Sequence, residues 1–350
     1  MKDKQQLNFF CIDKPNPSTE LILERKMSGK EYLFWGQDNR LPQELFQLYL
    51  NCPIMSGIIN GTVDFISGNE VVSDLDIVNR DGETISDIVR KIALDYELFG
   101  GFALQIINLP DKKELYVLDM QRVRTNEGES KIFYCKEWNK YGSKVVTYDA
   151  YDGRINQPNS VLLYKGHISR DCYPIPRYIG ALDSIRTSCE IGKFHLNNIL
   201  NNLSSSAIIN FNNGVPSEEV QKDIERRVND KFTGAENAGR TIVTFNDSKE
   251  NAVTVERLNE DRMDEKFNTL NKSITQEIFI SFRATPELFG FSSEGNGFSK
   301  TEFLESFELY YKTVVKPIQN DIVRVFEKIY NQPNIIQFVP FEIENKGGNQ

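Results

Sequence analysis

Few of the residues that build metal sites or disulfide frameworks occur in this sequence. Its 350 residues include five cysteines, which are widely scattered and never form a C-x-x-C pair. An odd, scattered set favours a reducing compartment and argues against both a disulfide framework and a structural zinc site. The two histidines, His167 and His195, form no H-E-x-x-H pair, and we expect both to be structural.

Long apolar runs are missing as well. The longest uncharged stretches, such as 194–211, are rich in Asn and Ser. A spanning helix needs a run of about 18 apolar residues, so the sequence predicts no transmembrane segment. The polar first residues lead into no apolar core with a small-residue cleavage site, so we expect no signal peptide.

Catalytic signatures are equally scarce. There is no G-x-S-x-G elbow, and the two faint phosphate-loop matches read G-K-E at 29–31 and S-K-T at 299–301. Neither has the glycines that let a backbone cradle a triphosphate. We therefore expect no enzyme activity, no cofactor, no metal site and no catalytic residue. One alternative stays open, namely a hydrolase acting through a carboxylate cluster at Asp261 and Asp264.

The composition is that of a folded but acidic chain. Apolar residues make up 39%, and 50 acidic against 41 basic residues give a formal charge of −9. Tight non-specific binding of nucleic acid needs clustered Lys and Arg that displace counterions. The chain is therefore not built to grip DNA, although an acidic wall is compatible with letting DNA pass.

The first half of the chain combines helices with strands. Apolar spacing predicts helices over 44–50, 54–67 and 86–99. Runs rich in β-branched and aromatic residues then predict five strands, at 102–107, 115–118, 131–134, 144–148 and 161–164. The expected fold class is α+β with an antiparallel sheet.

The second half reads as long helices around a small insert. Helical stripes cover 180–204 and 259–285, and the second stops at Thr285 because Pro286 disfavours the helical region for the residue before it. Between them we expect a β-α-β-β unit with strands at 207–211, 241–245 and 252–255 and a helix at 217–232.

The last helix carries its own start and bend signals. Ser299 and Glu302 form an S-x-x-E capping box, and apolar residues follow at helical spacing to residue 330. Pro317 lacks a backbone donor, so we expect a kink there. The apolar stripes of these long helices have few evident partners within the chain, which predicts that other copies of the chain cover them.

Five short motifs, in order, give the chain a family resemblance. They are W-G-Q-D-N-R-L-P at 35–42, Y-I-G-A-L at 178–182, G-A-E-N-A-G-R at 234–240, A-T-P-E-L-F-G at 284–290 and the S-x-x-E helix at 299–318. Together they resemble the portal proteins of tailed bacteriophages and prophages. Thr285 stands where the family pattern has its first proline.

The resemblance implies an architecture for the whole chain. It comprises an antiparallel-sheet wing domain, two long stem helices bracketing a small βαββ clip, and a long kinked C-terminal helix. The corresponding residues are 1–179 for the wing, 180–204 and 257–285 for the stem helices, 205–256 for the clip, 286–299 for the tunnel loop, 300–331 for the kinked wing helix and 332–350 for a short C-terminal tail.

The resemblance also implies a function. Portal proteins form a ring, expected to be a dodecamer, at one capsid vertex, and DNA is packaged through it by a separate terminase and later ejected. The implied partners are other copies of the chain, the large terminase, the major capsid or scaffold protein, a head–tail adaptor, and double-stranded DNA passing without sequence-specific binding. The implied location is the virion, after assembly in the host cytoplasm. The alternative is another ring-forming or scaffold-type phage structural protein without a DNA channel.

Three groups of residues are the implied sites. The tunnel loop contributes Phe291, Ser292, Ser293, Glu294, Gly295, Asn296 and Phe298. The clip contributes a contact surface for terminase or adaptor, Arg226, Arg227 and Lys231, and the helix kink is Pro317. The alternatives without a functional contact are that the loop merely connects two helices and that the clip residues form a solvent-exposed helix face.

Overall fold

Three helices form the first part of the fold, as predicted. The computed structural model describes residues 23–75, 77–153, 157–201, 208–211, 216–232, 242–245, 261–291 and 300–340. The helices are α1 (Leu41–Asn51), α2 (Pro53–Ser67) and α3 (Ile85–Phe99). The start of α3 has a capping box that the sequence analysis missed, in which Thr84 and Asp87 exchange hydrogen bonds. Gly100 ends α3 in the left-handed region, with φ of 81°.

A six-stranded sheet follows, and it contains all five predicted strands. The strand order is β5-β4-β9-β8-β7-β6. The strands are β4 (Gly101–Asn108), β5 (Lys113–Leu118), β6 (Val123–Thr125), β7 (Lys131–Cys135), β8 (Val145–Ala150) and β9 (Asn159–Lys165). Four of the five ladders are antiparallel, as expected, but β8 and β9 pair in parallel. That ladder is two residue pairs long, because only the end of β8 meets the start of β9.

Two small sheets were not predicted from the sequence. They pair β1 (Glu24–Arg25) with β2 (Phe34–Trp35) and β3 (Glu70–Ser73) with β12 (Ile336–Val339). Strands of two to four residues are too short to show an alternating pattern. The β12 strand lies within the predicted C-terminal tail, so the described part of that tail is joined to the N-terminal half.

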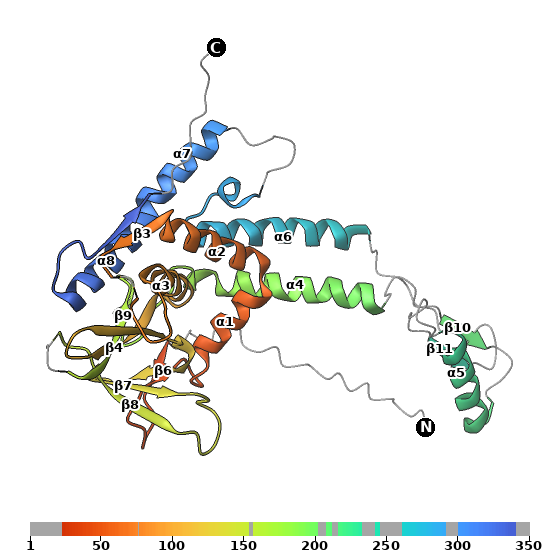
Figure 1. Cartoon of the computed structure of the whole chain (residues 1–350). Helices are drawn as coiled ribbons and strands as arrows, with labels where there is room; N and C mark the ends of the chain where they lie inside the picture. Colours follow the sequence, from red (N-terminus) through yellow and green to blue (C-terminus); the bar gives the residue numbers. More distant parts are fainter. Residues whose placement is uncertain are drawn as a thin grey trace, which may run out of the picture.

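Two long helices run side by side away from the body (Figure 1). They are α4 (Leu182–Asn201) and α6 (Asp261–Ser281), close to the predicted stem helices. Two short 3-10 helices, η1 (Met120–Arg122) and η2 (Ile179–Ala181), lie earlier in the chain, and η5 (Pro286–Phe289) follows α6. No helix among the described residues is long and apolar enough to cross a membrane.

The predicted insert is described in part. It contains β10 (Ile208–Phe211), α5 (Glu218–Phe232) and β11 (Ile242–Phe245), and the two strands pair in parallel. These elements match three of the four that the β-α-β-β pattern predicted. The strand predicted at 252–255 lies outside the described residues.

The final helical stretch is interrupted by a wider turn. It consists of α7 (Lys300–Tyr310), the π-helical segment η6 (Tyr311–Val315) and α8 (Lys316–Tyr330). Pro317 lies in the first turn of α8, directly after the π-helical segment. The capping box predicted at the start of this stretch involves Ser299, which lies outside the described residues.

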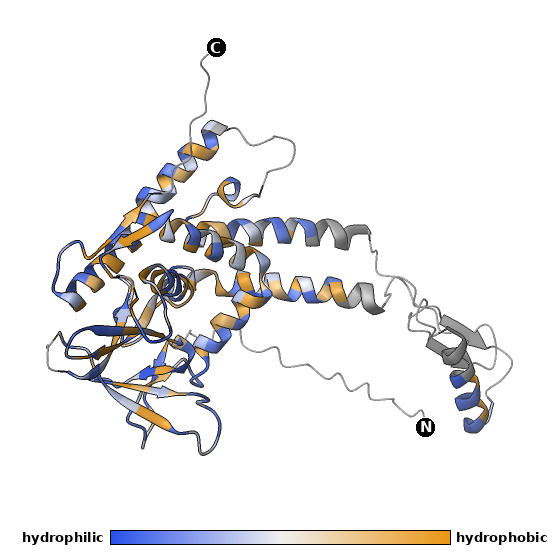
Figure 2. Cartoon of the chain, in the orientation of Figure 1, coloured by the Kyte–Doolittle hydropathy of each residue, from blue (hydrophilic) through white to orange (hydrophobic). Residues whose placement is uncertain are grey.

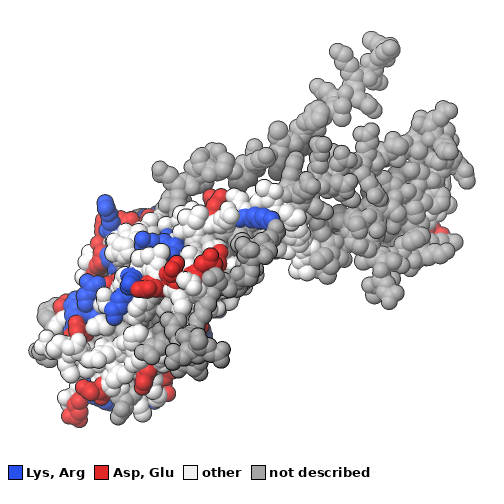
Figure 3. All heavy atoms as spheres, turned by 90° about the horizontal axis from the view of Figure 1, so that it is seen from above, with Lys and Arg blue, Asp and Glu red and all other residues white. Residues whose placement is uncertain are grey.

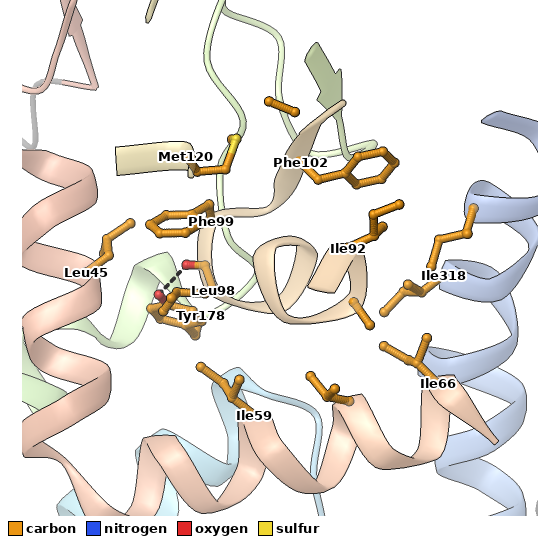
Figure 4. Packing of buried hydrophobic residues seen from close by; sticks show 14 of the residues in the cluster. Leu45, Ile59, Ile66, Ile92, Leu98, Phe99, Phe102, Met120, Tyr178 and Ile318 are labelled. Atoms are coloured by element: carbon orange, nitrogen blue, oxygen red, sulfur yellow. Dashed lines mark hydrogen bonds between the residues drawn. The ribbon is translucent and has the colours of Figure 1, made fainter. Parts of the chain in front are cut away.

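The core lies where the first three helices, the sheet and α8 meet (Figure 4). Leu45, Ile59 and Ile66 from the first two helices are buried together with Ile92 of α3 and Ile318 of α8. The hydroxyl of Tyr178 donates a 2.6 Å hydrogen bond to the carbonyl oxygen of Leu98 at the edge of this core.

The expectation that the apolar stripes lack partners within the chain is wrong for most described positions. On α8 the stripe is buried, because α8 packs against α2 and β12. The body-side ends of α4 and α6 are buried as well, at Ile185 and Cys189 on α4 and at Ile274 and Ile278 on α6, and Phe282, directly after α6, is also buried. Apolar residues remain exposed further out or on the far faces, as at Leu196, Leu270 and Ile280. Figure 2 shows apolar residues interspersed with polar ones along the described parts of α4 and α6.

Candidate functional site

The predicted tunnel loop is described only at its start. Phe291 is 44% exposed, and its ring packs edge-on against Phe279 of α6, with centroids 5.3 Å apart. The backbone N–H of Phe291 donates a 2.9 Å hydrogen bond to the carbonyl oxygen of Pro286. The other six predicted loop residues lie outside the described residues: Ser292, Ser293, Glu294, Gly295, Asn296 and Phe298.

The two sides of that connection meet in a cluster of rings. We call this cluster the aromatic clasp, and it consists of Phe65, Phe279, Phe289, Phe307 and Tyr310. Phe289, just before the connection, lies 5.6 Å from Tyr310 and 6.1 Å from Phe65, measured between centroids. Phe307, on α7 after the connection, lies 5.3 Å from Phe65. The Phe65 ring of α2 therefore contacts residues on both sides of 292–299.

A buried ion pair adjoins the aromatic clasp. Arg177 donates a 2.5 Å hydrogen bond to the carboxylate of Glu97, whose side chain is fully buried. The same nitrogen of Arg177 also lies 2.9 Å from the hydroxyl of Tyr310. That hydroxyl is in turn 2.7 Å from the hydroxyl of Thr62 on α2. Tyr310 thus connects the clasp to the segment that leads into α4.

Burial and charge set the protonation of this pair. Burial raises the pKa of Glu97, and the positive charge of Arg177 only partly offsets this. Burial acts to lower the pKa of Arg177, but Glu97 and Tyr310 outweigh it, so the pKa of Arg177 is raised. The guanidinium also lies over the ring of Phe282, 5.5 Å from its centroid. The charge of Arg177 is therefore held between a carboxylate and aromatic faces.

The predicted clip surface lies on α5. Arg226 is exposed and lies 3.6 Å from Asp223 one turn earlier, as an ion pair along the helix. Arg227 and Lys231 belong to the same helix, but their side chains lie outside the described ones. The contact role of these three residues stays a prediction.

The predicted kink at Pro317 coincides with an irregular stretch of helix. Pro317 has no N–H to donate to the turn before it, and that turn is the π-helical segment. The hydroxyl of Tyr311 in this segment lies 3.2 Å from Gln319, whose side-chain amide donates to the carbonyl oxygen of Ile66. The irregular turn is thereby fastened to α2, and the kink itself stays a prediction.

The alternative based on carboxylate chemistry is not tested by the described side chains. Asp261 and Asp264 lie in the first turn of α6, and their side chains are not among the described ones. The ring of His195 lies 5.9 Å from that of Phe194, edge-on. Among the described residues there is no group of three His, Cys, Asp or Glu placed to hold a metal ion.

Charge is mixed on the face seen in Figure 3. Lysine and arginine lie among aspartate and glutamate over the described body, and each sign is interrupted by the other. Charges of opposite sign pair elsewhere in the described structure too, as Arg90 does with Asp64 and Arg186 with Glu44. The described residues of this face form no uniform basic patch of the kind that grips nucleic acid.

Comparison with known proteins identifies the family. The model of the family described as phage portal protein matches residues 77–342, which is well over half of the chain. No curated protein matches the chain. The family match spans the elements from α3 to β12, including four of the five residues of the aromatic clasp; Phe65 precedes the matched range.

Solved structures with the same fold come from gene transfer agent (GTA) particles. Two are chains from "Neck of empty GTA particle computed with C6 symmetry" and "Virion of native gene transfer agent (GTA) particle", each with a TM-score of 0.57 and 15% identity. They cover 85% of this chain and 84% and 83% of their own. A third, from "Neck of native GTA particle computed with C12 symmetry", has a TM-score of 0.56 and 16% identity, over 85% of this chain and 84% of that chain. With the family model matched over residues 77–342, this chain belongs to the phage portal protein family.

Proposed function

We propose that this chain assembles into a ring at one vertex of a phage capsid, with a central channel through which a separate terminase packages DNA. The match of the portal family model to residues 77–342 carries the proposal. The C6 and C12 symmetries named for the similar neck structures support a closed ring, expected to have twelve copies. The ring would be part of the virion, after assembly in the host cytoplasm.

The family architecture assigns a role to each part of the fold. The paired helices α4 and α6 would form the stem, and the unit of β10, α5 and β11 the clip. Residues 286–299 would form the tunnel loop facing the channel, and the sheet with α1–α3 and α8 would form most of the wing. This assignment is supported by the order of the elements and by the pairing of α4 with α6.

The negative charge of the chain is consistent with a channel whose wall does not bind the DNA that passes through it. Each copy carries a formal charge of −9. A basic lining would release counterions from DNA and bind it, whereas acidic or mixed walls let a polyanion slide. We infer that DNA passes without sequence-specific contacts.

The remaining partners follow from the same assignment. Arg226, Arg227 and Lys231 on α5 would contact the large terminase during packaging and the head–tail adaptor afterwards. The wing would contact the major capsid or scaffold protein. ATP hydrolysis would belong to the terminase, since the chain has no phosphate-loop sequence.

The direct test is the assembly state of the purified chain. Negative-stain microscopy at high protein concentration should show rings with an open centre, and native mass spectrometry should give one dominant copy number. A chain that stays monomeric at high concentration would contradict the proposal. Rings with a closed centre would favour the alternative of a ring-forming structural protein without a channel.

The channel role of the loop has a test of its own. Deleting residues 292–296 should leave rings intact, because the aromatic clasp on either side of the deletion is untouched. Particles assembled with this variant should retain less packaged DNA, measured as protected genome per particle. Unchanged DNA content would favour the alternative that the loop merely connects two helices.

A further inference from the structure

A glycine in the middle of α2 lies directly under the aromatic clasp. A Cβ added to Gly61 would lie 2.9 Å and 3.0 Å from two carbons of the Phe289 ring. Real side chains essentially never pack that closely, so a larger residue would force the ring to move. Glycine in a helix interior is otherwise unfavourable relative to alanine. The glycine at position 61 therefore indicates that accommodating the Phe289 ring contributes more to stability than the helix propensity that alanine would add.

The Phe289 ring has little freedom to give way. It is surrounded by rings from three other elements: Phe65 on α2, Phe279 on α6 and Tyr310 on α7. The backbone on its C-terminal side is held as well, because the N–H groups of Gly290 and Phe291 donate to the carbonyl oxygens of Glu287 and Pro286. Phe289 is partly buried, and the three rings in contact with it oppose its displacement on those sides.

We propose that Gly61 is a positioning residue, which seats Phe289 in the aromatic clasp and so fixes where the connection 292–299 leaves and re-enters the folded body. The inference rests on the proposed function only in giving that connection a channel role. Phe289 and Phe291 precede the connection and Phe307 and Tyr310 follow it. A shift of Phe289 therefore changes the packing of the residues on both sides of the connection 292–299.

A second glycine in α2 supplies a matched control. An added Cβ at Gly57, one turn earlier, meets no atom within 4 Å. Changing either glycine to alanine raises helix propensity equally and restricts the unfolded chain equally. Only Gly61→Ala pushes against the clasp, so a difference between the two variants isolates that contact.

Hydrogen exchange on the purified wild-type chain and both variants tests the proposal. The amides of Gly290 and Phe291, which bond to Glu287 and Pro286, should exchange about tenfold faster in Gly61→Ala, the size of an ordinary overpacking penalty. Gly57→Ala should leave them unchanged. A peptide from α3 reports global stability and should change little in either variant. Equal exchange at Gly290 and Phe291 in the two variants would overturn the proposal.

A milder variant keeps the test decisive if Gly61→Ala does not fold. Phe289→Leu removes the ring from the aromatic clasp without introducing a clash. It should speed amide exchange at Gly290 and Phe291, while exchange in the α3 peptide stays unchanged. Unchanged exchange in Phe289→Leu would overturn the proposal as well.

The failure of this inference can be told from the failure of the channel function. Hydrogen exchange on the isolated chain tests the clasp alone. Particles assembled with Gly61→Ala should retain less DNA than particles with Gly57→Ala. If exchange changes as expected but DNA retention does not, the clasp stands and the channel role of 292–299 falls.

Discussion

Tyr178 stacks on Phe282 with ring centroids 4.9 Å apart and an interplanar angle of 22°. Tyr178 lies just before α4, and Phe282 directly follows α6, so this pair joins the start of one long helix to the end of the other. Arg177, the preceding residue, lies over the same Phe282 ring. The junction of the two helices with the body is therefore held by stacked rings and by the buried pair of Arg177 and Glu97.

Removing the cation of this buried pair should destabilise the fold strongly. Arg177→Met would leave the carboxylate of Glu97 buried without its partner, and such changes cost about 3–5 kcal/mol. Urea unfolding followed by circular dichroism measures the loss. The double variant Arg177→Met/Glu97→Gln should recover part of it, because the uncompensated charge is gone.

An exposed ion pair serves as the control for that prediction. Arg90 pairs with Asp64, and the two side chains are 61% and 56% exposed. Arg90→Met should cost no more than about 1 kcal/mol, because solvent screens the attraction. Comparable losses from Arg177→Met and Arg90→Met would mean that the buried pair does not hold the junction.

A partly buried acid on α3, Asp95, should make stability depend on pH. Burial, with a smaller contribution from Asp119, raises the pKa of Asp95 well above its ordinary value. The folded chain then binds this proton more tightly than the unfolded chain, so the free energy of unfolding falls as pH rises above about 4. Asp95→Asn should remove up to about 1.4 kcal/mol per pH unit of that slope. Urea midpoints between about pH 5 and pH 8 measure it.

Asp87 provides a comparison of opposite sign. The hydroxyl and backbone N–H of Thr84 lower the pKa of Asp87. Its contribution to stability is therefore present above the ordinary pKa and is lost only as pH falls through the lowered one. Asp87→Asn should leave the slope above about pH 5 unchanged. A slope that persists in Asp95→Asn would assign the pH dependence to other groups.

The elements were largely predictable because their signals are local. The helix at 86–99 and the strand at 102–107 lie within two residues of the observed bounds. The pairing of β12 with β3 was not predictable in this way. It joins residues more than two hundred positions apart through strands of four residues, and nothing local in either segment specifies the partner.

The apolar stripe of α8 is covered within the chain and not by other copies, again for a physical reason. The spacing of Ile318, Ile322 and Val325 shows that one face of α8 is covered, but not what covers it. The cover turned out to be α2 and β12 of the same chain. The family assignment was nevertheless confirmed, since the order of short motifs is independent of the packing argument.

The candidate site was predictable only in part. The segment around Phe291 was found because its composition differs from that of the helices beside it. The aromatic clasp and the Glu97–Arg177 pair were missed, since they join α2, α3, η5 and α7 in space. A glycine at 61, within a helical run of apolar residues, was the available sign that something packs closely there.

Reversing charge on α5 should impair docking without harming the fold. Arg226 is exposed, so Arg226→Glu with Arg227→Glu should change the unfolding free energy by no more than about 0.5 kcal/mol. If these residues contact the terminase, packaged DNA per particle should fall while rings still form. Arg90→Glu on α3 is the matched control. Packaging that survives the change on α5 would remove this surface as the motor contact.

Two exposed leucines on the long helices should affect assembly but not folding. Leu196 on α4 and Leu270 on α6 are 55% and 44% exposed in the single chain. Leu196→Asp or Leu270→Asp should therefore leave the unfolding free energy within about 0.5 kcal/mol of wild type. Burial of a leucine between copies is worth about 1.5–3 kcal/mol, so each change should weaken ring formation at least tenfold, measured by sedimentation. Tyr141→Asp, at a fully exposed apolar position between β7 and β8, is the control. Equal weakening by all three variants would show that the helices α4 and α6 hold no special place in the contact between copies.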